Sequence, residues 1–492
     1  MSSAYIRGVD RHQVMLLPEQ VEDYVSANSV ARVIDAFVEG LARGGSESIL
    51  PAERQTSVAG GRRSYDPAVL LKLLIWGYLK RVRSTRQLEE AARSNLEVIW
   101  LLGKLSPDHC SISRFRSSHS KAIARLLKQF NLICSRLELF GAEEVSVDGV
   151  LLKAINSKDN NFTQNRLNRR LKKLQAEIET YLQALEQSES ESVPTLLPAE
   201  IEDLQSKLAQ LRQTQAMTLA MQEKALNSPT GQLSLSDPDS RLLSKKKSPG
   251  TAVVGYLAQS VVDSKYHLIA AVEVTQQGNE MGQLTPMLKA AREGMHLPDS
   301  EASAPAIRAL ADGGYGDYND IAQAVNEGFE PWVKVAETTL EATSGLYARS
   351  SFEYDAQRDA YRCPEGKYLL RHSDMKRGHA TYQTYYHLPS CRQCPVRNLC
   401  TTGKYRKIKR HQHQDLIKAM NHRMVENPEV YPRRSASVEH PFGSMMFWNE
   451  GRNLLCAGLL KANAEFTLSA LAYNLKRALK ITGFARMMEA LS

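Results

Sequence analysis

Three acidic residues occupy positions where carboxylates could act together. Asp148 stands in the middle of the β-rich run "VSVDGVLL", although a carboxylate in a core strand is costly unless it is paired or binds a metal ion. Asp312 ends the run "AIRALAD" before "GGYG", and ligands of α/β sheets gather at the carboxyl ends of strands. Glu439 follows Ser437, which is expected to cap a helix, so Glu439 and Pro441 would lie in its first turns.

Together these acids suit phosphoryl transfer with two divalent metal ions. Mg²⁺ or Mn²⁺ prefers oxygen ligands, and two ions about 3.5–4 Å apart can activate a nucleophile and stabilise a leaving oxygen. Each acid also has a simpler explanation. Asp148 could cap a strand, Asp312 could be a turn residue, and Glu439 could favour the helix dipole.

Four of the seven cysteines are close together in the sequence, at Cys363, Cys391, Cys394 and Cys400. One C-x-x-C pair with two further cysteines fits a tetrahedral structural zinc site. An iron–sulfur cluster and four unliganded thiols are the alternatives.

Two basic runs favour a polyanionic partner. The first contains Lys404, Arg406, Lys407, Lys409 and Arg410 within "GKYRKIKRHQHQ", and the second contains Lys245, Lys246 and Lys247. Such residues suit contacts with a DNA backbone, although a single run is usually a solvated loop. Trp448 could stack on an unpaired base or belong to the core.

Helices and strands must position these residues. Residues 14–140 show helical periodicity, and the second half of this region could form a helix-turn-helix-like DNA reader or a packing domain with a solvated basic face. The arginines expected on its exposed faces are Arg83, Arg86, Arg93, Arg114 and Arg116. Beyond 145, strands at 145–152, 252–275, 306–312 and 329–336 alternate with helices at 280–295 and 317–328, which predicts a mixed α/β sheet.

Leucines at a spacing of three to four residues over 164–226 predict an antiparallel helical hairpin or short coiled coil inserted into this sheet domain. Its role is structural, or it serves dimerisation or lies as an arm along a partner. The longest apolar run, 67–79, contains Lys72 and is too short for a membrane span, and the N-terminus has no apolar signal core. We therefore expect a cytoplasmic protein. Its net charge of +9 is weak evidence for a polyanionic partner.

Several of these stretches resemble the DDE transposases of bacterial insertion sequences, whose catalytic domain has an RNase H-like fold. The resemblance rests on "VSVDGVLLKA", "ALADGGYG" and "VEHPFGSMMFW", with residues 237–288 and 465–479, and the N-terminal helices look like the DNA-end-binding region of the family. It implies that Asp148, Asp312 and Glu439 are the DDE triad.

The resemblance also implies roles for basic residues near Glu439. Tyr431 and Arg434 resemble the family's contacts with the transposon-end phosphates, although Arg434 is one residue farther from Glu439 than in the Tyr-Arg-Glu-Lys signature. Met446 stands where relatives with that signature have lysine, and Arg452 and Lys461 are the candidates to replace it.

The expected organisation is an α/β protein with two insertions. Residues 1–140 form the helical DNA-end-binding domain, 141–162 with 229–340 the RNase H-like core, 163–228 the hairpin, 341–415 the Cys-rich zinc-type insertion, and 416–492 the C-terminal helices. We expect a transposase that binds double-stranded DNA as a homodimer. A catalytically idle DNA-binding protein and a nuclease without strand transfer are the alternatives.

Overall fold

The computed structural model describes residues 20–43, 64–190, 198–228, 231–243, 252–298, 305–335, 346–448 and 452–492. The chain divides into two compact units. The first comprises Met1–Leu126 and Leu471–Ser492, and the second comprises Leu127–Ala470. In the described residues no helix is both long and apolar enough to cross a membrane.

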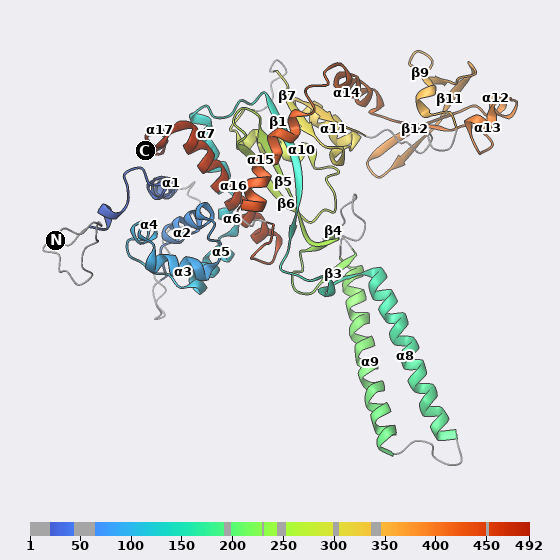
Figure 1. The fold of residues 1–492 in the computed structure, drawn as a ribbon. Helices are drawn as coiled ribbons and strands as arrows, with labels where there is room; N and C mark the ends of the chain where they lie inside the picture. Colours follow the sequence, from blue (N-terminus) through green and yellow to red (C-terminus); the bar gives the residue numbers. More distant parts are fainter. Residues whose placement is uncertain are drawn as a thin grey trace, which may run out of the picture. The chain divides into compact units, whose positions relative to one another are not determined.

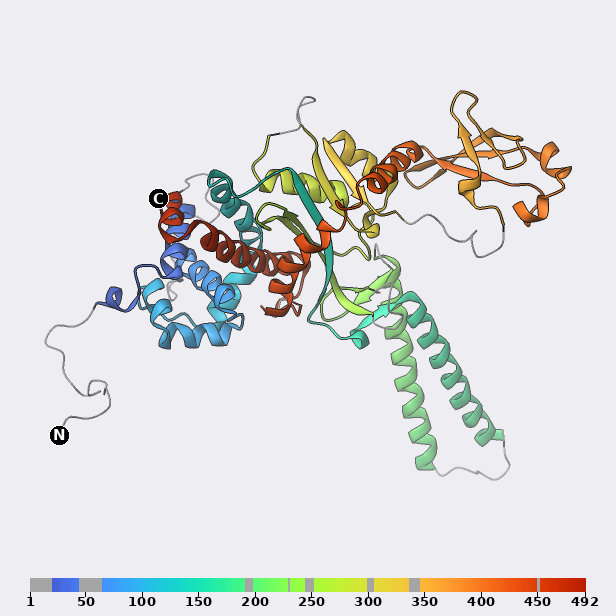
Figure 2. The ribbon, with the colours of Figure 1, turned by 45° about the horizontal axis from the view of Figure 1, so that its top comes forward.

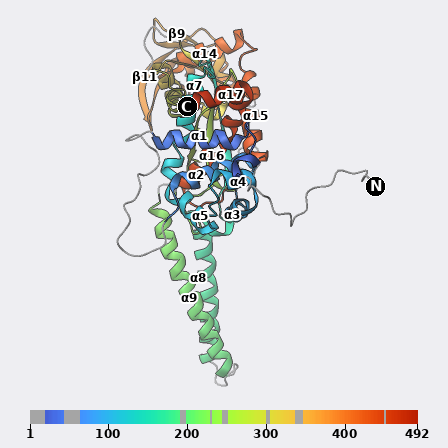
Figure 3. The same ribbon diagram turned by 90° about the vertical axis from the view of Figure 1, so that its left-hand side faces the viewer.

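The first unit is helical, as predicted (Figure 3). Its central helix α2 is apolar on all sides and almost wholly buried, and it begins with Pro67 after Asp66, whose side chain accepts a hydrogen bond from the amide of Ala68. Lys72 is buried and forms ion pairs with Asp35 and Glu39. The helices of this unit are α1 Val30–Arg43, α2 Pro67–Lys80, α3 Thr85–Ser94, α4 Leu96–Leu101, α5 His109–Ser118, α6 Ser120–Ile123, the C-terminal part of α16, and α17 Phe484–Leu491.

The second unit contains the predicted mixed sheet (Figure 1). β1 lies between β5, which is antiparallel to it, and β7, which is parallel to it, while β8 extends the parallel side and β6 and β4 pair with β5. The strands are β1 Glu144–Lys153, β4 Arg241–Leu243, β5 Val253–Asp263, β6 Ile269–Thr275, β7 Ile307–Ala311 and β8 Phe329–Val333.

Helices pack against this sheet through a common core. Val145 and Val147 of β1 contribute to a buried cluster with residues of α10 Leu284–Gly294, α11 Tyr318–Asn326 and α14 Gln414–Glu426. Because strand side chains alternate between faces, Ser146 and Asp148 point to the other face of β1. Leu310 of the neighbouring β7 packs there in a second cluster, with Trp332 and Val430. The unit also contains α7 Leu126–Arg136 and the N-terminal part of α16 Leu459–Thr482.

The predicted hairpin is present. α8 Gln164–Ser190 and α9 Pro198–Leu226 run side by side in Figures 1 to 3, next to the small pair β2 Asn161–Thr163 and β3 Gln232–Ser234. Leu167, Leu174, Ile178 and Leu208 of the predicted stripe are buried. A hydrogen bond from Gln222 Nε2 to Asn168 Oδ1 (2.6 Å) also joins the two helices.

The Cys-rich region folds as a separate five-stranded antiparallel sheet, which the sequence analysis did not predict (Figure 2, orange). Its core consists of Phe352, Tyr361, Leu369, Tyr385 and Ile408. The elements are β9 Glu353–Asp355, β10 Ala360–Arg362, β11 Tyr368–Arg377, β12 Ala380–Tyr386, β13 Ile408–His411, α12 Leu388–Arg392 and α13 Arg397–Cys400.

The helix that carries Glu439 begins earlier than predicted. α15 spans Arg433–Gly443, so Glu439 lies in its second half and Pro441 lies inside it. Pro432 precedes the helix with a φ of −59°, which already suits helical geometry. Ser437 is therefore not a cap, and its hydroxyl donates to the Arg433 carbonyl (3.1 Å). A π-helix, Ser444–Trp448, follows α15.

Candidate active site

Strand pairing brings Asp148 and Asp312 together. β1 and β7 are parallel, and Val147 is the register partner of Ala311, so the next residue of each chain segment is one of the two aspartates. Asp312 then caps a short 3₁₀ turn, Gly313–Tyr315, by accepting a hydrogen bond from the Gly314 amide at 2.7 Å. The two carboxylates thus lie side by side at the carboxyl end of β7, as predicted for the sheet edge.

A guanidinium lies beside this pair. Arg434 Nη1 of α15 is 3.1 Å from Asp148 Oδ2, and the two side chains are 17% and 25% exposed. Burial raises the pKa of Asp148, the Arg434 cation opposes that shift, and the nearby Asp312 carboxylate adds to it. Burial also raises the pKa of Tyr431, again with Arg434 opposing and both aspartates reinforcing the shift. Tyr431 and Arg434 therefore flank the aspartate pair.

A third carboxylate at this edge was missed by the sequence analysis. A Cβ atom placed on Gly314 would lie 2.5 Å from Glu280 Oε2 and 2.8 Å from Asp312 Oδ1, so these two oxygens border the same point. A Cβ atom placed on Gly149, directly after Asp148, would lie 3.3 Å from Glu280 Oε1. The sequence analysis placed residue 280 at the start of a helix, whereas α10 begins at Leu284 and Glu280 belongs to the preceding loop.

Glu439 occupies a different face of its helix from Arg434. The buried face of α15 contains Ser437, Val438 and Pro441, whereas Glu439 is exposed. Glu439 is five positions after Arg434, which corresponds to about 140° around a helix with about 3.6 residues per turn. The role of Glu439 as the third acid of the triad stays a prediction.

The other residues predicted near Glu439 have varied environments. Met446 is a core residue with 4% exposure, so an apolar side chain packs where the signature has lysine. Arg452 is exposed in a segment that pairs with the end of β1, where its carbonyl accepts a hydrogen bond from the amide of Lys153. Lys461 is half-buried near the start of α16. The side chain of Trp448 and the run Lys245, Lys246 and Lys247 lie outside the described residues.

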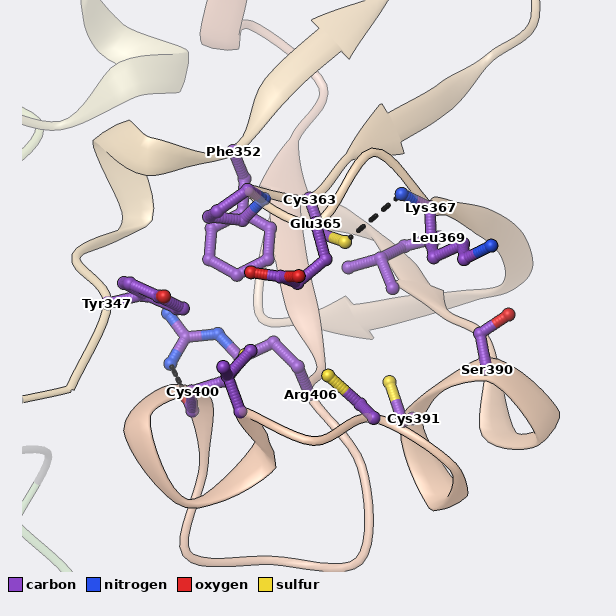
Figure 4. Close-up of a pocket in the computed structure, with 13 residues that line it drawn as sticks. Tyr347, Phe352, Cys363, Glu365, Lys367, Leu369, Ser390, Cys391, Cys400 and Arg406 are labelled. Carbon is purple, nitrogen blue, oxygen red and sulfur yellow. Dashed lines mark hydrogen bonds between the residues drawn. The ribbon is translucent and has the colours of Figure 1, made fainter.

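The four clustered cysteines line one pocket of about 30 Å³ in the five-stranded sheet (Figure 4). The Lys367 amide donates to Cys363 Sγ at 3.3 Å. Burial raises the pKa of the Cys400 thiol to about 11, and the other three cysteines reinforce that shift. Among the described residues, however, no group of three or more His, Cys, Asp or Glu side chains is arranged to hold a metal ion. The zinc site thus stays a prediction.

The basic run after the cysteines divides into two sets. Lys404, Lys407 and Lys409 are exposed. Burial contradicts a DNA contact for Arg406 and Arg410, which are 7% and 4% exposed. Strand alternation in β13 turns Arg410 inward, where its guanidinium lies 3.7 Å from the centre of the Tyr354 ring and pairs with Asp415.

Arg406 is also part of the small core. Its Nη1 donates to the Cys400 carbonyl at 3.1 Å, as Figure 4 shows, and its guanidinium lies 5.1 Å from the centre of the Phe352 ring. It therefore packs the sheet against α13, which ends at Cys400.

The predicted basic face of the helical unit is smaller than expected. Arg86, Arg93 and Arg114 are exposed, but Arg83 and Arg116 are buried. Arg116 Nη1 lies 3.4 Å from the Arg83 carbonyl, to which it donates, and the Arg83 guanidinium lies 5.8 Å from the centre of the Tyr78 ring. These two arginines join helices of the unit and are not available to a partner.

Two family models match the chain. The Transposase domain (DUF772) matches residues 19–118, and the Transposase DDE domain matches residues 362–479, which include the cysteine pocket and Tyr431, Arg434 and Glu439. Comparison with curated proteins and with solved structures gives no match. The two matches cover parts of both compact units and both describe transposases. The two matches therefore support a DDE-type transposase of insertion sequences.

Proposed function

We propose that the chain binds the terminal inverted repeats of its insertion sequence and cuts and rejoins DNA by phosphoryl transfer. In this proposal residues 1–140 bind the DNA ends, and 141–162, 229–340 and 416–492 form an RNase H-like core. The observation that carries the proposal is the Asp148–Asp312 pair at the edge between two parallel strands, next to Arg434. The strand arrangement, with an antiparallel half and a parallel half meeting at β1, supports the RNase H-like assignment.

The donor set suits magnesium or manganese. Asp148 and Asp312 supply hard carboxylate oxygens from adjacent strands, and Glu439 is the predicted third ligand. When bound, two such ions would lower the pKa of an attacking water and offset charge on the leaving oxygen.

The proposed reaction has two steps. In the first, the oxygen of a water molecule forms a bond to phosphorus, the bond from phosphorus to the 3′-oxygen breaks, and that oxygen leaves as a 3′-hydroxyl after gaining a proton. In the second, the hydroxyl oxygen attacks a target phosphate, and a second 3′-oxygen leaves.

The protein's own side chains would position the DNA. Arg434 and Tyr431 flank the aspartates and would orient the phosphate, since a guanidinium matches phosphate geometry.

The test uses labelled duplexes that carry the element's ends, incubated with the full chain and Mg²⁺ or Mn²⁺. We expect nicking at the ends followed by joining to target DNA, and Asp148→Ala should abolish both steps while end binding persists. Absence of nicking by the wild-type chain would favour an idle DNA-binding protein. Nicking without joining would favour a nuclease, and cleavage retained by Asp148→Ala would refute the aspartate assignment.

Two finer assignments belong to the same proposal. Zinc bound by Cys363, Cys391, Cys394 and Cys400 would stabilise the small sheet, and the shared pocket and the amide that donates to Cys363 Sγ support this. A homodimer on DNA is the expected assembly.

A further inference from the structure

Helix α8 of the hairpin concentrates cations in the part that follows β2 (Figure 1). Between Asp159 and Glu177 the sequence contains no acid and five basic residues. These are Arg166, Arg169, Arg170, Lys172 and Lys173, and all five are exposed. The first, second, third and fifth of them have the spacing i, i+3, i+4 and i+7, which places them on one face of a helix. We call the five residues the basic stripe.

Arg166 fixes the start of this helix within the protein. Its guanidinium donates to the carbonyls of Lys158 (2.5 Å) and Asn161 (3.1 Å) and lies 5.1 Å from the centre of the Phe162 ring. These contacts join α8 to the segment before it. Arg166 therefore has a structural task in addition to any role toward a partner.

The other cations of the basic stripe have few partners within the protein. Lys173 Nζ lies 3.7 Å from Glu177 Oε1, which is a long ion pair. In the part of the chain that the structure describes, neither Arg169 nor Lys172 forms an ion pair. Like charges four residues apart, such as Arg169 and Lys173, destabilise a helix. The basic stripe therefore weakens α8 by itself, and an anion lying on it would remove that repulsion.

The far end of the hairpin has the opposite charge. After Lys173, α8 contains no further Lys or Arg and has four glutamates, and α9 begins with three acids before Lys207. Lys207 itself pairs with Asp203, with 2.5 Å between Nζ and Oδ2. Surface charges that serve only solubility are usually mixed in sign. A polyanion is therefore attracted to the part of the hairpin next to β2 and β3 and repelled by the far end.

The hairpin begins at a point fixed to the six-stranded sheet. Asp237 follows β3 and is fully buried. Its carboxylate accepts hydrogen bonds from the Tyr256 hydroxyl of β5 (2.8 Å to each oxygen) and from the Gly458 amide (3.1 Å). β3 pairs with β2, and β5 pairs with β1, which carries Asp148. DNA on the basic stripe would thus be held relative to the strand of Asp148.

We propose that the basic stripe binds the phosphate backbone of duplex DNA and holds the duplex against the hairpin. The proposal rests on the proposed function, which supplies DNA as the polyanion. Every exposed side chain of α8 from 164 to 175 is polar or basic, whereas a protein interface needs an apolar centre. A second copy of the chain is therefore a poorer occupant than DNA. Contacts with phosphates do not depend on base sequence, so the basic stripe adds affinity without specificity.

Fluorescence anisotropy of the full chain on two labelled duplexes tests the proposal, one with the element's end and one with a scrambled sequence. The double variant Arg169→Gln, Lys172→Gln should make the slope of log affinity against log salt less steep by about 2 on both duplexes, since each phosphate contact contributes about 1. The charge-conserving swap Arg169→Lys, Lys172→Arg should keep the wild-type slope. A swap that changes the slope as much as the double variant does would overturn the role of charge.

The matched control is the double variant Lys207→Gln, Arg212→Gln, which removes two exposed charges from α9. Both positions lie nearer the far end than Gln215, whose Nε2 donates to Gln175 Oε1 at 3.3 Å. They are therefore beyond the basic stripe, and the slope should equal that of the wild type. An equal change in the control would overturn the assignment. If the double variant of the basic stripe does not fold, Lys172→Gln alone should make the slope less steep by about 1.

The failures of the two proposals are distinguishable. A wild-type slope in the double variant of the basic stripe overturns this proposal and leaves the proposed function standing. Conversion of a dimer to a monomer by the same variant, measured by light scattering without DNA, also overturns it and assigns the basic stripe to a second copy of the chain. Equal affinity of the wild type for both duplexes contradicts end recognition in the proposed function, and a less steep slope in the variant then still supports the basic stripe.

Discussion

Asp148 shows how the environment of one residue sets its charge. Its carboxyl is largely buried beside Asp312, and the Arg434 guanidinium offsets only part of that cost, so its pKa in the folded chain exceeds the ordinary value of 3.8. The folded chain therefore binds this proton more tightly than the unfolded chain does. At higher pH, where the carboxylate is ionised, the free energy of unfolding is smaller. The ionised form of Asp148 is therefore electrostatically unfavourable in the folded chain.

The raised pKa of Asp148 leads to a prediction for Asp148→Asn in the absence of metal. At neutral pH the variant should have a larger free energy of unfolding than the wild type, because asparagine cannot ionise. Each pKa unit of elevation is worth about 1.4 kcal/mol. As pH falls through the raised pKa toward 3.8, the difference should shrink and then vanish.

Urea unfolding with a chelator present, followed by circular dichroism at several pH values, measures this difference. Glu293→Gln removes an exposed acid and should show no comparable gain. A wild type that is the more stable protein at neutral pH would contradict the prediction.

At the scale of elements, the five-stranded sheet has few core residues for its size. Five buried side chains form its core, and Cys363, Cys391 and Cys400 pack against them. Small units usually need a disulfide or a metal to supplement such a core. The cysteines are free thiols, so zinc is the cross-link that we propose.

Zinc removal should therefore loosen this sheet. We expect about one zinc per chain by mass spectrometry of the purified protein. Cys391→Ser should lose it, with faster proteolysis within residues 346–411, because the metal contributes folding free energy. Cys110→Ser, which alters an exposed thiol of the helical unit, should retain the zinc. Equal zinc content in Cys391→Ser and wild type would refute the site.

At the scale of the whole molecule, the net charge of +9 matters only through cations that reach solvent. Lys404, Lys407 and Lys409 are exposed, and the Lys407 ammonium lies 5.0 Å from the centre of the Tyr405 ring. Arg406 and Arg410, from the same run, are buried. The net charge includes the exposed lysines and the buried arginines equally, but of these residues only the exposed lysines can release counterions from DNA.

Lys407→Ala should therefore reduce the salt dependence of end binding. The slope of log affinity against log salt should fall by about 1, measured by fluorescence anisotropy between about 50 and 200 mM salt. Arg406→Ala is the matched control, because it should lose about 1–3 kcal/mol of stability with its hydrogen bond to the Cys400 carbonyl and leave the slope unchanged. The reverse pattern would place the DNA contact at Arg406.

Features that depend on neighbouring residues could be predicted from the sequence. Leucine spacing predicted the α8–α9 hairpin, and alternating strands and helices predicted the mixed sheet. Asp148 and Asp312 were identified because each stands in or after an apolar strand, and such strands pair predictably in α/β folds.

Features that depend on contacts between distant segments could not be predicted and are seen only in the folded chain. Glu280 reaches Asp312 because Asp320, in another helix, caps α10 and fixes the loop before it. Arg406 and Arg410 look like solvent-exposed cations in sequence, but the faces of a small sheet turn them inward. The start of α15 at Arg433 places Glu439 on a different face from Arg434. Sequence periodicity predicts on which side of its own helix or strand a residue lies. The residues that it contacts depend on how helices and strands distant in the sequence pack together.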